Sequence, residues 1–259
     1  MEQNPKSEGK CLFCGKTFAK AGINRHLKTH LDEKLKTGKS GVSFLVKVEV
    51  QKWAPKEYFL SLWIDGEAKM GDIDTFLRSI WLECCGHMSA FRNPKNRGNG
   101  WDFFEAIELM EQGKVKAYEK LMEESAGEIP MSRKVKDVFQ KDLKLEYEYD
   151  FGSSTYLQLT VIEEYSVKAE KKILLLSRNE PIQWLCDKCG KVPATQICSV
   201  HVWEEESKFC NKCAKKHAKE CPDFDDYAAM PLVNSPRMGV CAYEGGTIDT
   251  ERDGVFVNK

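Results

Sequence analysis

The cysteines and histidines of this 259-residue chain are concentrated near its two ends. The chain has eleven Cys and five His, and twelve of these sixteen residues lie within residues 11–30 and 186–221. Thiolates and imidazoles at short spacing are the ligands that tetrahedral zinc prefers. The pattern therefore predicts a zinc-binding module near each end of the chain.

The N-terminal cluster consists of Cys11 and Cys14, followed by His26 and His30. A two-residue gap holds two thiolates on one turn, and an i, i+4 spacing places two imidazoles on one face of a helix. This pattern resembles the two-Cys, two-His zinc finger, although the spacer between the Cys pair and the His pair is one residue shorter than usual. The resemblance implies one structural zinc ion in a zinc finger with a basic arm over residues 1–40.

The first forty residues are basic, with nine Lys or Arg against four Asp or Glu, a net charge of +5 against −1 for the whole chain. A basic arm of this kind is typical of a segment that contacts phosphate. Of the finger positions that face bases in DNA complexes, only Arg25 can make a bidentate contact to guanine. The residues expected to contact nucleic acid are Lys16, Lys20, Arg25 and Lys28. Alternatively, these cations only keep the surface of the finger hydrated, and the finger contacts another protein or stabilises this one.

The C-terminal cluster has eight ligands, which are enough for two tetrahedral sites without an open coordination position. Zinc held in this way is structural rather than hydrolytic. The alternating pairs resemble B-box and related treble-clef modules, which implies a cross-braced arrangement. One ion would then be held by Cys186, Cys189, Cys210 and Cys213, and the other by Cys198, His201, His217 and Cys221. A sequential pairing satisfies the same count and stays open, and with the finger the chain would hold about three Zn²⁺.

Four of the cysteines and histidines lie outside these clusters, namely Cys84, Cys85, His87 and Cys241. Adjacent side chains on an extended strand point to opposite faces, so the segment 84–87 is a poor arrangement of nucleophile and base. Free cysteine is commonly a small buried hydrophobe. We therefore expect core cysteines and no catalytic residues, with Cys241 as an alternative ligand for the C-terminal module.

The segment between the clusters, residues 41–180, predicts an α+β domain with a mostly antiparallel sheet. Alternating apolar residues predict strands at 44–50, 58–64, 143–149, 157–161 and 173–176. Apolar residues at helical spacing predict a helix over 73–81. Composition predicts a helix from 101 to about 124 that Gly113 divides, and a short helix follows at 134–139.

The order of these elements carries a second resemblance, together with the segments 87–91 (HMSAF) and 149–152 (YDFG). It resembles the plasmid pRiA4b open-reading-frame-three-like family, which includes TnpR-type passenger proteins of mobile elements in bacteria and archaea. The resemblance spans roughly residues 43–180 and implies a fold and a prokaryotic, mobile-element setting. After residue 152 the chain departs from the family's usual Asp, Trp and His. Residues 181–259 would form the two-zinc module plus a tail that wraps onto that module or onto the sheet.

Two functions are compatible with these features. The first is a zinc-binding, non-catalytic protein that associates with nucleic acid, or with a mobile-element nucleoprotein complex, through its finger. The second is a protein–protein interaction adaptor whose zinc modules are purely structural. The chain shows no signal peptide and no apolar run of membrane-spanning length, and its cysteines suit a reducing compartment, so we expect a cytoplasmic protein. No small-molecule substrate is evident.

Overall fold

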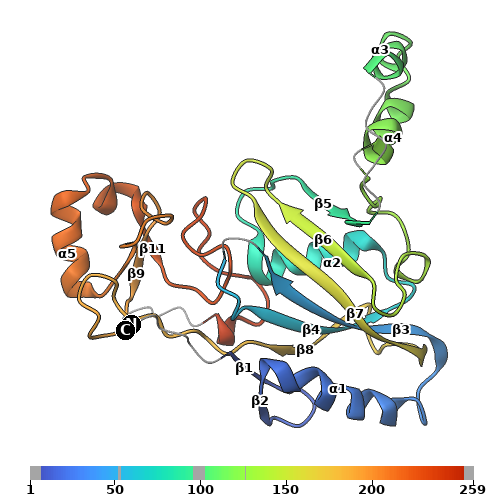
Figure 1. Ribbon diagram of the computed structural model, residues 1–259, viewed down its shortest axis with the longest axis horizontal. Coiled ribbons are helices and arrows are strands. Elements are labelled where there is room, and N and C mark those ends of the chain that lie inside the picture. The colour runs from blue at the N-terminus through green and yellow to red at the C-terminus, as the bar shows by residue number, and fades with distance from the viewer. Residues whose placement is uncertain (1–6, 52–53, 96–102, 126, 254–259) are drawn as a thin grey trace.

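The computed structural model describes residues 7–51, 54–95, 103–125 and 127–253. At its centre lies a six-stranded antiparallel sheet with the strand order β5-β6-β7-β3-β4-β8 (Figure 1). Its strands are β3 (Ser40–Val50), β4 (Phe59–Asp65), β5 (Ser89–Arg92), β6 (Lys144–Tyr149), β7 (Thr155–Val167) and β8 (Ile173–Arg178). The predicted α+β class is confirmed.

One face of the sheet is covered by α2 (Met70–Leu77), which continues into a π-helical turn, η1 (Arg78–Leu82). The apolar stripe predicted for residues 73–81 packs here against the sheet. Its fully buried members are Ile73, Leu77, Ile80 and Trp81. Helix and sheet together form the larger hydrophobic core of the molecule.

The opposite face of the sheet is covered by the segment for which the sequence predicts a zinc finger, called the finger below. A hairpin of β1 (Glu8–Lys10) and β2 (Thr17–Ala19) leads into α1 (Lys20–Lys34), which runs beneath the sheet in Figure 1. Ile23, Leu27 and Leu31 of α1 are fully buried. They form a second core with sheet residues that include Leu45, Phe59, Trp63 and Leu176. Because α1 covers this face, every residue of β4 is buried.

Backbone contacts also join the finger to the sheet. The Leu12 N–H donates to the Leu176 carbonyl at 2.9 Å, and the Glu180 N–H donates to the Glu8 carbonyl at 2.7 Å. Gly9 allows this close approach, since a Cβ at its position would lie 2.6 Å from the Phe59 ring. The finger is thus packed into the central domain rather than separated from it by a linker.

Two helices form a hairpin that projects from the sheet in Figure 1, α3 (Phe103–Glu111) and α4 (Val115–Ser125). Gly113 lies between them with a φ of 68° and divides the helix as its position predicts. The predicted start of this helix, residues 101–102, falls outside the described residues. A short helix, η2 (Val135–Asp137), occupies the predicted segment 134–139.

The C-terminal module is a small sheet with one helix, at the left of Figure 1. Its strands, in the order β10-β9-β11, are β9 (Gln196–Cys198), β10 (Lys208–Phe209) and β11 (Ala229–Pro231). Its helical elements are α5 (Asn211–Glu220) and the π-helical turn η3 (Phe224–Ala228). A last 3-10 turn, η4 (Thr250–Arg252), lies in the tail.

The tail returns to the central domain through buried polar contacts. The fully buried Arg178 donates from Nη2 to the Asn234 carbonyl at 2.5 Å and to Asp253 Oδ1 at 2.6 Å. Ser235 Oγ donates to the Trp81 carbonyl at 2.6 Å. Because removal of one partner would leave a buried charge without compensation, such contacts hold a segment firmly. The tail therefore connects the C-terminal module back to the sheet.

Within the part of the chain that the structure describes, no helix has both the length and the apolar character that a membrane span requires.

We expect Leu27→Ala to lower the free energy of unfolding by about 2–5 kcal/mol, because it would leave a cavity between α1 and the sheet. Urea denaturation measures the loss, and Glu33→Ala, on the exposed side of α1, serves as the control. A loss below about 1 kcal/mol would show that α1 is not part of the core.

Candidate metal centres

The four ligands predicted for the finger come together between the hairpin and α1. Cys11 and Cys14 lie on the turn between β1 and β2, and His26 and His30 lie one turn apart on α1. Cys14 Sγ is 3.2 Å from His26 Nε2, which is 3.1 Å from His30 Nε2. All four ligand atoms lie within 4.8 Å of one another.

These separations fit one tetrahedral ion. Zinc holds sulfur at about 2.3 Å and nitrogen at about 2.0–2.1 Å, which places neighbouring ligand atoms about 3.3–3.8 Å apart. Phe18 stacks on the His26 ring, with ring centroids 4.0 Å apart, and fixes its orientation. Burial lowers the pKa of His26, which favours the neutral imidazole that a metal requires.

The residues predicted to contact nucleic acid from the finger have different environments. Lys20 forms an ion pair with Glu49 of β3 at 3.0 Å, and Lys28 forms one with Glu163 of β7. Both cations are therefore directed towards carboxylates of the sheet. Arg25 is exposed on the outer side of α1, and Lys16 is exposed on the hairpin.

The eight C-terminal ligands form the two sets that the cross-braced arrangement groups together. In each set all four ligand atoms lie within 4.8 Å of one another. One set consists of Cys186, Cys189, Cys210 and Cys213, and the other of Cys198, His201, His217 and Cys221. The sequential alternative would instead require ligands to be exchanged between these two sets.

Local structure holds these ligands in place. α5 begins directly after Cys210, carries Cys213 and His217, and ends directly before Cys221, so one helix serves both sets. Phe209 stacks on His217 with ring centroids 4.3 Å apart and orients the imidazole.

The electrostatics of the four-Cys set favour a cation. Burial and the neighbouring thiol of Cys210 raise the pKa of Cys213 to about 12, since crowded thiolates without a cation repel one another. The backbone N–H of Lys191 lowers the pKa of Cys189 to about 7. A divalent ion would stabilise all four thiolates together.

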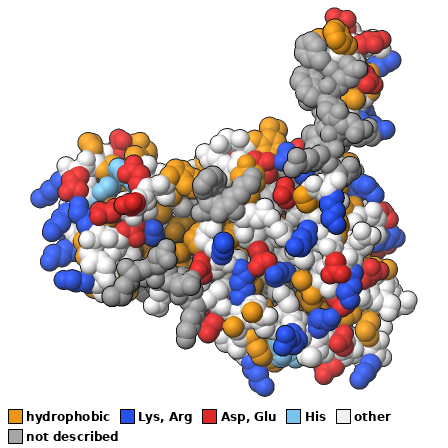
Figure 2. Space-filling view, in the orientation of Figure 1, with side chains coloured by type: hydrophobic (Ala, Val, Ile, Leu, Met, Phe, Trp, Pro, Cys, Tyr) orange, Lys and Arg blue, Asp and Glu red, His pale blue; other side chains and the backbone are white. Residues whose placement is uncertain are grey.

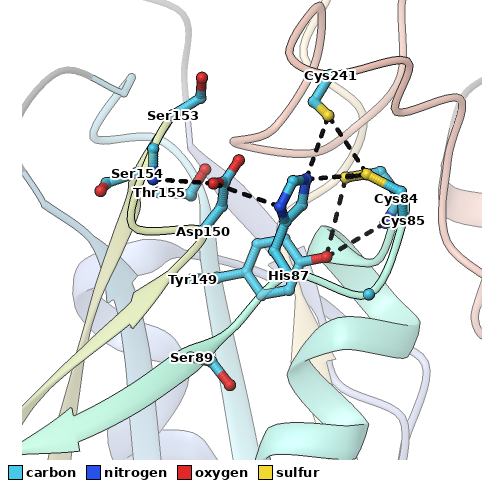
Figure 3. A network of polar contacts seen from close by, with 12 residues as sticks. Cys84, Cys85, His87, Ser89, Tyr149, Asp150, Ser153, Ser154, Thr155 and Cys241 are labelled. Carbon is cyan, nitrogen blue, oxygen red and sulfur yellow. Dashed lines mark hydrogen bonds and ion pairs between the residues drawn. The ribbon is translucent and has the colours of Figure 1, made fainter.

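The residues outside the predicted clusters form a fourth group. Cys84, Cys85, His87 and Cys241 have ligand atoms within 4.8 Å of one another (Figure 3). The expectation of core cysteines is wrong for Cys85 and Cys241, which are exposed, and Cys84 is only half-buried. The thiols of Cys84 and Cys85 do not point apart, since their Sγ atoms lie 3.7 Å from each other, and Gly86, with a φ of 78°, turns the chain between them and His87.

A count could have indicated this group from the sequence. Eleven Cys and five His make four complete sets of four, with none left over. Four Cys/His clusters are thus positioned to hold a metal. Each provides four protein ligands, the composition of a closed structural site.

The comparisons with known proteins add little to this geometry. No protein-family model matches the chain, and no curated protein matches it. A crystal structure of a protein of unknown function, MM3350 from Methanosarcina mazei Go1, is similar with a TM-score of 0.37 and 11% identity, over 73% of this chain and 87% of that one. A similarity at this level says nothing about function.

Cadmium substitution followed by cadmium NMR distinguishes the two pairings of the C-terminal ligands. The chemical shift depends on the number of thiolate ligands. Because the structure groups four cysteines in one set, we expect a resonance from an all-sulfur site. Sequential pairing would give two sites with three sulfurs and one nitrogen, so absence of an all-sulfur resonance would contradict the structure.

Proposed function

We propose that the chain is a zinc-stabilised, non-catalytic protein that associates with nucleic acid. We assign the contact to a lysine stripe on α5, defined as Lys212, Lys215, Lys216 and Lys219. The observation that carries the proposal is the spacing and exposure of these four cations.

The lysine stripe occupies one side of its helix. Positions i, i+3, i+4 and i+7 lie within one narrow arc of an α-helix. All four lysines are exposed, and among the described residues none has an ion-pair partner within 4.0 Å. Figure 2 shows Lys and Arg side chains along the left edge of the C-terminal module, over α5. Four exposed cations in a row form a surface that fits phosphate groups.

The zinc ligands would hold the lysine stripe rigid. Cys213 and His217 are buried on another side of the same helix and belong to the two C-terminal sets. Metal binding at both sets would therefore fix the helix that carries the lysines. A preformed cationic surface loses less conformational entropy on binding than a flexible arm.

The finger offers a weaker surface for the same partner. Two of its four predicted contacts, Lys20 and Lys28, are paired with Glu49 and Glu163. Its apolar side faces the sheet, so the finger helix is used for packing. We therefore assign it a structural role.

Two exposed aromatic residues on the C-terminal module favour a single-stranded partner. Trp203 and Tyr227 are 67% and 64% exposed. Both line a cavity of about 440 Å³. Bases that are not paired can stack on such rings.

Two further considerations agree with the proposal. Each metal cluster provides four protein ligands, so none leaves a coordination position for a substrate. The resemblance of the central domain to mobile-element passenger proteins fits a protein that works near nucleic acid. Lysine contacts to phosphate carry no sequence information, so we expect little sequence preference.

The test is fluorescence anisotropy of zinc-loaded protein with short duplex and single-stranded DNA and RNA, from about 50 mM to about 200 mM salt. We expect replacement of the lysine stripe by Gln at all four positions to abolish most of the binding. The slope of log K against log salt for duplex should fall by roughly 0.9 per lost contact, about 3.6 in all. Trp203→Ala should weaken single-strand binding more than duplex binding.

A matched control carries the same change of charge elsewhere, with Lys114, Lys116, Lys144 and Lys171 replaced by Gln. A second control, Lys16→Gln with Arg25→Gln, removes the exposed finger cations. Loss of binding in either control but not in the stripe variant would contradict the assignment to α5. Absence of binding by the unaltered protein at low salt would favour the protein-adaptor function instead.

A further inference from the structure

We propose that Cys84, Cys85, His87 and Cys241 form a fourth zinc centre, which fastens the tail to the edge of the central sheet. This centre would be a clasp between two segments far apart in the sequence. Neither the finger nor the C-terminal module contributes a ligand to it.

The ligand atoms have the separations that one tetrahedral ion requires. Cys85 Sγ lies 3.7 Å from Cys84 Sγ and 3.5 Å from Cys241 Sγ. His87 Nε2 lies 2.9 Å from Cys85 Sγ and 3.2 Å from Cys241 Sγ. Tetrahedral zinc places such atoms about 3.5–3.8 Å apart, so small adjustments would accommodate an ion. Three thiolates and one imidazole are a donor set typical of zinc.

The imidazole of His87 has the supporting carboxylate that metal-bound histidines use. Its Nε2 faces the thiols, and its Nδ1 lies 3.5 Å from Asp150 Oδ1 (Figure 3). A carboxylate behind the second ring nitrogen fixes the tautomer and makes the imidazole a better ligand. Asp150 is buried and has a φ of 64°, a left-handed conformation that is uncommon outside glycine.

A buried arginine supplies the charge that such a centre needs. Three thiolates around a divalent ion carry a net charge of −1, and this charge lies close to the carboxylate of Asp150. Arg237 is fully buried, with Nη2 3.6 Å from Cys84 Sγ and 2.5 Å from Asp150 Oδ2. Its guanidinium therefore lies between the two negative groups and stabilises both.

The backbone of the tail is bent in a way that presents Cys241 to the other ligands. Cys241 and Ala242 have φ values of 49° and 54°, two consecutive left-handed residues that are not glycine. Such conformations are energetically unfavourable outside glycine and persist where the surrounding structure requires them. Tyr243, which is 1% exposed, and the buried Arg237 hold the chain on either side of this bend.

The fourth centre should release its metal first. Two of its four ligands, Cys85 and Cys241, are exposed, whereas the finger has one exposed ligand and the C-terminal sets have none. A chelator or an alkylating reagent can therefore reach it before the others. The clasp would tie Cys241 to a loop 156 residues earlier in the chain, so its opening should free the adjacent tail.

Native mass spectrometry of the zinc-loaded full chain tests this proposal. We expect four zinc ions per chain, three in Cys241→Ser, and four in the control Met88→Leu, which lies next to a ligand but outside the cluster. With cadmium, Cys241→Ser should lose only the resonance from three sulfurs and one nitrogen. Retention of the other resonances would show that the loss is local rather than a result of unfolding. Cys85→Ser is a second variant with the same expected outcome.

Hydrogen exchange provides a readout that does not depend on the ion count. We expect exchange in residues 239–247 to increase in Cys241→Ser and on partial chelation, with little change in α5. The proposal is overturned if the unaltered chain holds only three zinc ions and an alkylating reagent modifies Cys84, Cys85 and Cys241 at the rate of free thiols. The proposal is also overturned if Cys85 and Cys241 form a disulfide in zinc-loaded protein that is kept under reducing conditions, or if Cys241→Ser holds four ions.

Discussion

The arrangement of the molecule depends on the crowding of thiols and imidazoles into four sets. Within each set the ligand atoms lie no more than 4.8 Å apart. Burial and the neighbouring thiols together raise the pKa of Cys213 to about 12, and thiolates this close repel one another unless a cation lies between them. Metal binding would convert this repulsion into a cross-link. The four cross-links would fall at the hairpin of the finger, at the edge of the sheet and at two points in the C-terminal module.

The finger shows how such a cross-link is combined with ordinary hydrophobic packing. A small finger has too little core to bury much apolar surface by itself. Here Ile23, Leu27 and Leu31 extend the finger's core onto the sheet, and they cover the face of the sheet opposite α2. The same packing directs Lys20 and Lys28 towards sheet carboxylates. A helix used for packing in this way has little basic surface left, and the exposed cations of α5 become the better candidates for contact with phosphate.

The regular elements of the central domain could be predicted from the sequence, because strands and helices have distinct periods of apolar residues. The alternation from Leu145 to Tyr149 gave β6, and the stripe from Ile73 to Trp81 gave α2 and η1. The packing of the finger was harder to predict, since its apolar residues serve an isolated finger equally well. The signal was in β4, where Phe59 and Trp63 are apolar on one face while Leu60 and Leu62 are apolar on the other.

The fourth cluster was missed for a different physical reason. Spacing identifies ligands that share a turn or a helix, but Cys241 joins the others only through the path of the tail. That path is set by buried contacts of Arg178 and Arg237, which leave no periodic pattern in the sequence. The ion pairs of Lys20 and Lys28 are equally long-range. Contacts of this kind follow from the tertiary structure, whereas the finger ligands follow from local spacing.

We infer that every cysteine and histidine of the chain is a metal ligand. The most direct measurement is the zinc content of the reduced, zinc-loaded protein, determined together with the number of cysteines that react with a thiol reagent. We expect four zinc ions per chain and slow reaction of all eleven cysteines, which becomes fast and complete after chelation. Three ions or fewer, with Cys84, Cys85 and Cys241 reacting at the rate of free thiols, would contradict it.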